Sequence, residues 1–290
     1  MAVYDKNGNV VTSVYGKDGN PLNVAYDKNG TVIYRKNPIT LKVMQYNCGQ
    51  WYIGSHNNVP SDKDAEYYAL QSGIIQNVDA DVLLLEEYTA QFSKAGRTAL
   101  SMLQSMYPYY HEETNGTTTT VTQRAIYSKY PISNYVTHPF NDGTTYYYDT
   151  CTITIDGIPI MIGCAHLHWN DLQKRVAEAQ MILNTLSSAT RFILGGDFNM
   201  ADFSSTSGAD YQQVIKLFVD EGYHIANGGD FGFIPTYCGT ADGASWSNLD
   251  QIITSANITI NSVTTDNTKA TDSIADVIDH IPLIGTFSIN

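Results

Sequence analysis

The segment FILGGDFNM at residues 192–200 decides how this chain is interpreted, because an apolar strand-like run ends there on an acid and an amide. Its first residues suit a buried strand, two glycines follow, and Asp197 and Asn199 come next. A carboxylate at the end of a buried strand rests on a rigid backbone and faces the surrounding loops. Catalysis uses such a layout, whereas packing alone does not require it.

Other apolar strand-like runs in the chain also end on polar groups. These groups are Asn47 after KVMQY, Glu87 after VLLLE, His166 after IMIGCA, and Asp279 with His280 in VIDHIPL. A single Asp or His at a strand end is most often a cap, a turn former or a satisfied hydrogen-bonding group. Because the pattern recurs along the chain, we expect these ends to meet at one polar site.

The residue types at these ends favour a hard divalent cation. Carboxylate and amide oxygens without clustered thiols suit Mg²⁺, and also Mn²⁺ or Ca²⁺, better than Zn²⁺. Such an ion beside two histidines and further carboxylates is what the hydrolysis of a phosphate ester needs.

Composition limits the partners and the compartment. The 290 residues are 43% hydrophobic and 16% charged, as in a globular protein, and no run approaches the ~18 apolar residues of a membrane span. The start of the chain lacks the pattern of a secretory signal, which leaves open a secreted or cell-surface protein whose signal has been removed, or a cytoplasmic one. The net charge of -13 argues against a surface that tracks many phosphates.

The four cysteines show no C-x-x-C spacing, which argues against a zinc knuckle. Cys151 and Cys164 flank an expected hairpin whose Asp-Gly turn places Cys151 opposite Ile162 and Cys164 opposite Asp149. A disulfide between the two cysteines would be diagonal across this hairpin. The sequence therefore predicts free thiols.

Residues 1–36 contain an eleven-residue repeat, written VYDKNGNVV, VYGKDGNPL and AYDKNGTVI. Each unit has the pattern of a hairpin with an Asn-Gly or Asp-Gly turn. Three such units bury little core alone, so we expect them to pack on the main domain, another chain or a larger assembly. They form either an extension that covers a sheet edge or a module that attaches the protein to a surface or a larger assembly.

Residues 37–290 read as one domain of alternating strands and helices. Helices are predicted over 61–78, 93–107, 171–188 and 211–223, and strands over 41–47, 81–87, 123–132, 148–168, 191–199, 247–255 and 281–289. This alternation indicates a layered architecture with sheets inside and helices outside.

In residues 40–290, the motifs MQYNCG, DVLLLEEY, AIYSKYPI, AHLHWN, GGDFNM, LDQII and IDHIPL follow one another in the order of a known family. The chain resembles the endonuclease/exonuclease/phosphatase superfamily, which has the deoxyribonuclease I-like fold. That resemblance implies an α+β fold, a four-layer α/β sandwich of two packed, mostly antiparallel sheets flanked by helices. The N-terminal β-hairpin repeats would be an extension of it.

The resemblance also implies roles for individual residues. The metal ligands would be Asn47, Glu87 and Asp279, and the catalytic residues would be His166, Asp197, Asn199, Asp250 and His280. In this scheme Asp197 holds or deprotonates the attacking water, and Asp250 orients His280. Asn199 and His166 contact the phosphate, and His166 is also a candidate proton donor.

Two positions depart from the family pattern. Glu86 stands where the family usually has glutamine, and Ile278 stands where it has serine. The extra carboxylate of Glu86 would either recruit a second cation or point away from the site.

Three further residues are candidate substrate contacts. Trp169 suits stacking on a base or sugar, and Arg124 and Arg175 suit a phosphate. Each has a structural alternative, because a tryptophan can pack on the next helix and a basic residue can lie on a solvated helix face.

These features lead to one preferred function and two alternatives. The preferred function is a Mg²⁺-dependent phosphodiester hydrolase acting on DNA, an endonuclease of low sequence specificity. The first alternative is a phosphodiesterase or phosphatase for a lipid headgroup, of the sphingomyelinase or inositol-phosphatase type. The second is a surface-attachment protein whose repeats carry the function.

Overall fold

The computed structural model describes most of the chain, namely residues 13–17, 20–22, 24–26, 32–35, 38–49, 64–88, 93–94, 97–98, 103–112, 124–141, 146–200, 206–238, 246–266 and 280–289.

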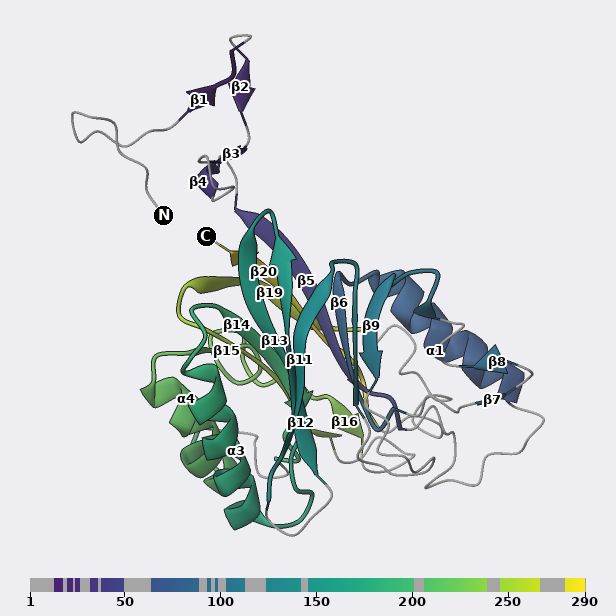
Figure 1. The fold of residues 1–290 in the computed structure, drawn as a ribbon. Helices are drawn as coiled ribbons and strands as arrows, with labels where there is room; N and C mark the ends of the chain where they lie inside the picture. The colour runs from purple at the N-terminus through teal and green to yellow at the C-terminus, as the bar shows by residue number, and fades with distance from the viewer. Residues whose placement is uncertain are drawn as a thin grey trace.

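Two six-stranded sheets pack face to face (Figure 1). The first sheet has the order β19 (Ile258–Thr265), β20 (Leu283–Ile289), β5 (Ile39–Asn47), β6 (Val82–Glu86), β10 (Arg124–Ser128) and β9 (Tyr109–Glu112). The second sheet has the order β11 (Ile132–Pro139), β12 (Tyr147–Ile155), β13 (Ile158–His166), β14 (Phe192–Asp197), β18 (Asp250–Thr254) and β15 (His224–Ile225). Each sheet contains one parallel pair, β5 with β6 and β13 with β14, between antiparallel neighbours.

Helices cover the outer faces of both sheets (Figure 1). α1 (Asp64–Val78) packs on the first sheet, and α3 (Leu172–Leu186) packs on the second. α4 (Lys216–Asp220) continues the π-helical turn η3 (Tyr211–Ile215) and lies beside α3. The predicted four-layer fold is therefore confirmed. No helix in the described ranges is long and apolar enough to cross a membrane.

The alternation of side chains along each strand builds two kinds of core. In β14, Ile193 packs between the sheets, whereas Phe192 and Leu194 pack beneath α3. Because both faces of the inner strands are covered, these strands are apolar throughout rather than alternating in polarity.

The expected hairpin is confirmed residue by residue. β12 and β13 pair with Ile155 opposite Ile158 and Cys151 opposite Ile162, as the two-residue turn requires. Cys48, Cys151 and Cys164 are buried and are not joined in a disulfide.

The helix predicted over 93–107 is wrong at residues 93–94 and 97–98, although Leu103 is helical. The structure pairs β7 (Ser93–Lys94) with β8 (Arg97–Thr98) as antiparallel strands, and residues 104–106 form a turn. The sequence places Ala95 and Gly96 between the two strands, and Gly in a short connection favours a hairpin over a helix.

Two of the N-terminal repeats contain paired strands. β1 (Val14–Tyr15) pairs with β2 (Pro21–Leu22), and β3 (Val24–Tyr26) pairs with β4 (Val32–Arg35). The first repeat lies outside the described residues. The paired strands stand beyond the start of β5, apart from the two large sheets (Figure 1).

Candidate active site

The site lies where the rows of side chains between the two sheets change from apolar to polar. On β14, the row runs from Ile193 through Gly195 to Asp197, and neighbouring strands repeat this change. The polar residues that end these rows are Gln45 and Asn47 on β5, Glu86 on β6, His166 on β13 and Asp250 on β18. The described part of the chain therefore brings together Asn47, Glu87, His166, Asp197, Asn199, Asp250 and His280, as the sequence predicts.

The two glycines of the GGD motif allow close packing around Asp197. A side chain at Gly195 would meet Leu84 and Gln45 from the facing sheet. A side chain at Gly196 would collide with the backbone carbonyl of Ala165 on the neighbouring strand. Gly195 therefore lets the first sheet pack closely on β14, and Gly196 lets β13 lie close beside it.

Asp197 is the centre of the site. Its Oδ2 atom accepts a hydrogen bond from Asn47 Nδ2 at 2.9 Å and lies 3.6 Å from His166 Nε2 and 3.5 Å from His280 Nε2. Its Oδ1 atom accepts the backbone N–H of Asn199 at 2.8 Å. One carboxylate is thus held by a strand end and faced by two imidazoles and an amide.

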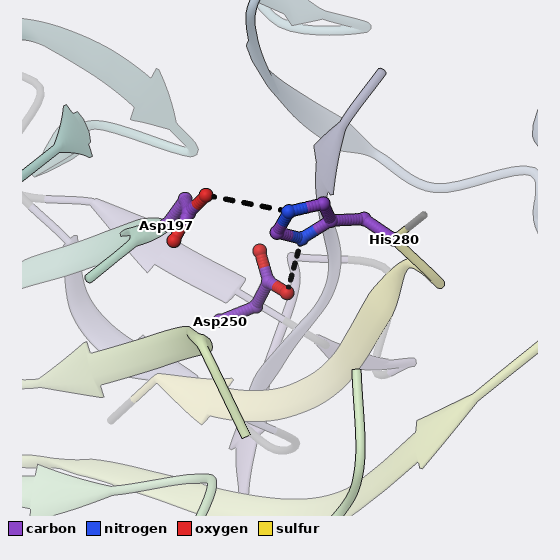
Figure 2. A group of neighbouring side chains, drawn as sticks. All are labelled: Asp197, Asp250 and His280. Atoms are coloured by element: carbon purple, nitrogen blue, oxygen red, sulfur yellow. Dashed lines mark hydrogen bonds and ion pairs between the residues drawn. The ribbon is translucent and has the colours of Figure 1, made fainter. Parts of the chain in front are cut away.

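His280 lies between two carboxylates (Figure 2). Its Nδ1 atom is 2.8 Å from Asp250 Oδ2, and its Nε2 atom faces Asp197. The backbone at His280 forms a bridge with Tyr237, whose ring lies against the imidazole. The structure therefore hydrogen-bonds His280 to Asp250, the residue expected to orient it.

Burial raises the pKa of the Asp250 carboxyl, and the adjacent His280 opposes this shift. The hydrogen bonds that Asp250 makes with His280 and Thr236 also lower this pKa. The Thr236 hydroxyl oxygen accepts the backbone N–H of Asp250 at 3.1 Å and helps to fix this residue.

Asn47 connects the two sheets through its side chain. Asn47 Nδ2 is 3.3 Å from Glu87 Oε1 in addition to its bond to Asp197. Glu87 is the first residue after β6 and has a φ of 50°, a conformation that is uncommon for residues other than glycine. Asp279, the third predicted metal ligand, lies outside the described residues.

The donor set fits a hard divalent cation. The ligand atoms of Asp197, Asp250 and His280 all lie within 4.8 Å of one another. Asp250 and His280 share a hydrogen bond, and Asn47 joins Asp197 to Glu87. Carboxylate and amide oxygens of this kind suit Mg²⁺, Mn²⁺ or Ca²⁺.

Asn199 links Asp197 to the loop after β13. Asn199 has a φ of 50°, a left-handed conformation that asparagine tolerates, and its Nδ2 atom donates to the Leu167 carbonyl at 2.8 Å. The Leu167 N–H in turn donates to the Asp197 carbonyl at 2.9 Å. These bonds fix the positions of Asp197 and His166 relative to one another.

Glu86 points away from the opening of the site. Its side chain is fully buried between the sheets, where it accepts hydrogen bonds from Gln45 Nε2 at 2.8 Å and the Cys164 thiol at 3.1 Å. Burial raises the pKa of Glu86 well above its ordinary value and also raises that of the Cys164 thiol.

The two arginines predicted to bind substrate are buried in ion pairs. Arg124 is fully buried, and its Nε atom lies 2.8 Å from Asp149 Oδ2. Arg175 Nη2 lies 2.7 Å from Asp210 Oδ1, and its Nη1 atom donates to the His168 carbonyl. Neither position fits the expected contact with a phosphate, because both guanidinium groups bind carboxylates inside the protein.

Trp169 is exposed and follows the loop residue His168 in the chain. Its side chain is 63% exposed, although the preceding His168 is buried. The loop is fixed because the His168 N–H donates to Glu178 and its carbonyl accepts from Arg175. Tyr146 packs against both His166 and His168.

Sequence reasoning missed the residues that support the site. Gln45, Thr236 and Glu178 each contact the backbone or side chain of a predicted site residue or its loop. For Gln45 a signal was present, because it follows Val43 by two positions on a strand and so shares its buried face.

A family model described as Endonuclease/Exonuclease/phosphatase family matches residues 44–273. Similar solved structures include an endonuclease/exonuclease/phosphatase from Beutenbergia cavernae, with 12% identity, 87% of this chain and 72% of that chain covered, and a TM-score of 0.63. TDP2 from C. elegans has 17% identity, coverage of 86% and 75%, and a TM-score of 0.61. ANGEL2, a 2',3'-cyclic phosphatase solved with adenosine-2',3'-vanadate, has 15% identity, coverage of 87% and 96%, and a TM-score of 0.65. No curated protein matches the chain.

Proposed function

Because the chain belongs to the endonuclease/exonuclease/phosphatase family, whose members hydrolyse phosphoester bonds, we propose that it is a Mg²⁺-dependent phosphodiesterase that nicks DNA with little sequence preference. The observation that carries this proposal is the convergence of Asn47, His166 and His280 on Asp197 Oδ2. Such a carboxylate is placed to hold a water molecule beside a scissile phosphate.

The residues of the site would have different roles in phosphodiester hydrolysis. A divalent cation held by Asn47 and Glu87, and by Asp279 as the sequence predicts, would neutralise charge on the phosphate oxygens. Asp197 accepts the proton of the attacking water. In their imidazolium forms, His280, oriented by Asp250, and His166 donate hydrogen bonds to the phosphoryl oxygens and the leaving oxygen.

The exposed side chain of Trp169 supports a substrate that carries a nucleobase. An indole that is held on a fixed loop and yet 63% exposed offers a flat face to a ligand. Stacking of a base on an aromatic ring contributes about 1–3 kcal/mol and depends little on base identity. The net charge of -13 and the internal pairing of Arg124 and Arg175 support contact with few phosphates.

We test the substrate class with a panel of phosphodiesters. Purified protein is incubated with supercoiled plasmid at low salt with Mg²⁺, Mn²⁺ or EDTA, and in parallel with sphingomyelin vesicles and an inositol phosphate. The proposal predicts metal-dependent nicking that the His280→Ala variant lacks. Cleavage of a lipid headgroup without nicking would overturn the DNA assignment in favour of a lipid phosphodiesterase.

The role of Trp169 gives a second test. Replacing Trp169 by Ala removes the stacking surface from an exposed position, so KM for DNA should rise by roughly 5- to 150-fold with little change in melting temperature. The matched control is Phe231→Ala, since Phe231 is also an exposed aromatic side chain but is not part of the site. Equal KM values in the parent and the Trp169 variant would remove Trp169 from the substrate site.

The N-terminal repeats carry a separate proposal, which is attachment of the enzyme to a surface or a larger assembly. Their paired strands lie apart from the two sheets that build the site, which supports a role in location rather than in chemistry.

A further inference from the structure

Gln45 is a buried amide in a row of side chains that is otherwise apolar until it reaches the site. The preceding members of this row, Leu41 and Val43, belong to the core between the sheets, and Gln45 is equally inaccessible to water. Burial of an amide costs free energy unless its polar atoms are hydrogen-bonded. Packing alone would therefore favour a third aliphatic residue here.

Both N–H groups of this amide are directed at carboxyl groups. Gln45 Nε2 is 2.8 Å from Glu86 Oε2 and 2.8 Å from Asp250 Oδ1. Among the residues that the structure describes, Gln45 Oε1 is buried without a hydrogen-bond partner. A buried acceptor without a hydrogen bond costs roughly 1–3 kcal/mol. The two hydrogen bonds that the Gln45 N–H groups donate offset this cost and favour the observed orientation of the amide.

The bond to Asp250 completes the set of contacts on that carboxylate. Asp250 Oδ2 is occupied by His280 Nδ1, and Oδ1 is occupied by Gln45, so the carboxylate cannot rotate without losing a bond. A fixed carboxylate fixes the plane and the tautomer of the imidazole. His280 Nε2 is thereby directed at Asp197.

We propose that Gln45 is a positioning residue that locks the Asp250–His280 pair in the orientation needed for catalysis. This inference rests on the proposed function, because it assigns Gln45 a part in that reaction. Glu86 holds the other side of the amide and so sets its position. Gln45 acts through Asp250 and does not touch substrate.

The test compares Gln45→Met with a matched control. Gln251→Met removes another fully buried glutamine of the same region, whose amide bonds the backbone of Asn227 rather than Asp250. Loss of an outer hydrogen-bonding partner commonly costs 10- to 100-fold, so kcat of the Gln45 variant should fall by about that factor with KM nearly unchanged. The Gln251 variant should lose stability but keep kcat.

An NMR measurement reports the tautomer of His280 and does not require an active enzyme. In the metal-free protein, at a pH where the imidazole is neutral, ¹⁵N shifts assigned with His280→Ala should show one Nδ1–H tautomer in the parent and a mixture in Gln45→Met. Gln45→Glu, which keeps the shape but carries at most one donor, gives the same readout if the Met variant fails to fold.

The possible results distinguish a failure of the role of Gln45 from a failure of the proposed function. A single tautomer with parental kcat in Gln45→Met, or an equal loss of kcat in Gln251→Met, overturns the role of Gln45. A parent protein that is inactive on every phosphodiester overturns the proposed function, while the tautomer measurement still decides whether Gln45 positions His280.

Discussion

At the scale of single residues, the site depends on groups that are buried beneath it as much as on groups that face the substrate. Glu86 illustrates this, because the sequence marks it only as a departure from the family pattern. Its environment, with Gln45 on one side and Cys164 on the other, follows from the packing of two sheets. That packing joins residues far apart in the chain, so the neighbours of Glu86 could not be read from local pattern.

The raised pKa of Glu86 gives a prediction about stability and pH. A carboxyl group whose pKa is higher in the folded than in the unfolded protein stabilises the fold fully below its unfolded pKa, near 4.5. This stabilisation is lost as the pH rises from there through the folded pKa. Glu86→Gln cannot ionise, so its melting temperature relative to the parent should increase with pH.

The measurement is thermal unfolding of both proteins in EDTA between about pH 5 and pH 8, where the effects of groups that do not interact with Glu86 cancel in the difference. A difference that stays constant or decreases with pH would show that Glu86 is not held in its neutral form by burial.

At the scale of elements, the predictions succeeded where a local rule fixes the geometry. The β12–β13 register followed from one Asp-Gly turn, and α3 lies within the helix predicted over 171–188, where the structure shows Asp171 as its N-cap. The helix predicted over 93–107 fails at residues 93–94 and 97–98, because Gly96 in a short connection favours a turn between two short strands. The burial of Arg124 and Arg175 was not predictable locally, because their partners Asp149 and Asp210 lie 25 and 35 residues away.

The GG pair on β14 supplies a prediction at this scale. Alanine at Gly196 would collide with the backbone of Ala165, which cannot move without separating β13 from β14. Alanine at Gly195 meets mainly the end of the flexible Leu84 side chain, 2.5 Å away. Overpacking typically costs 1–3 kcal/mol, so Gly196→Ala should lower the melting temperature clearly more than Gly195→Ala. Calorimetry on the two variants decides this, and the reverse order would contradict the described sheet packing.

At the scale of the whole molecule, residues 37–290 contain every predicted catalytic residue, and both large sheets begin within this range. The order of the motifs predicted this fold through the resemblance to the family. In such a fold the strand ends that form the site come at fixed places in the chain order. Removal of residues 1–36 should therefore leave the nicking rate and the melting temperature unchanged. A large loss of either in the shortened protein would show that the repeats belong to the catalytic domain.

We propose above all that the Asp197 carboxylate performs the chemistry where the two sheets meet. The most direct measurement is the rate of Mg²⁺-dependent plasmid nicking by the parent and by Asp197→Asn, together with the melting temperature of each. Asparagine keeps the shape of the side chain but cannot accept the proton of water, so the rate should fall by about 10²–10⁴-fold. Its single oxygen cannot accept from both Asn47 and Asn199, so the melting temperature should also fall, while the variant stays folded at the assay temperature. Nicking by the Asp197→Asn variant at the parental rate would contradict the account.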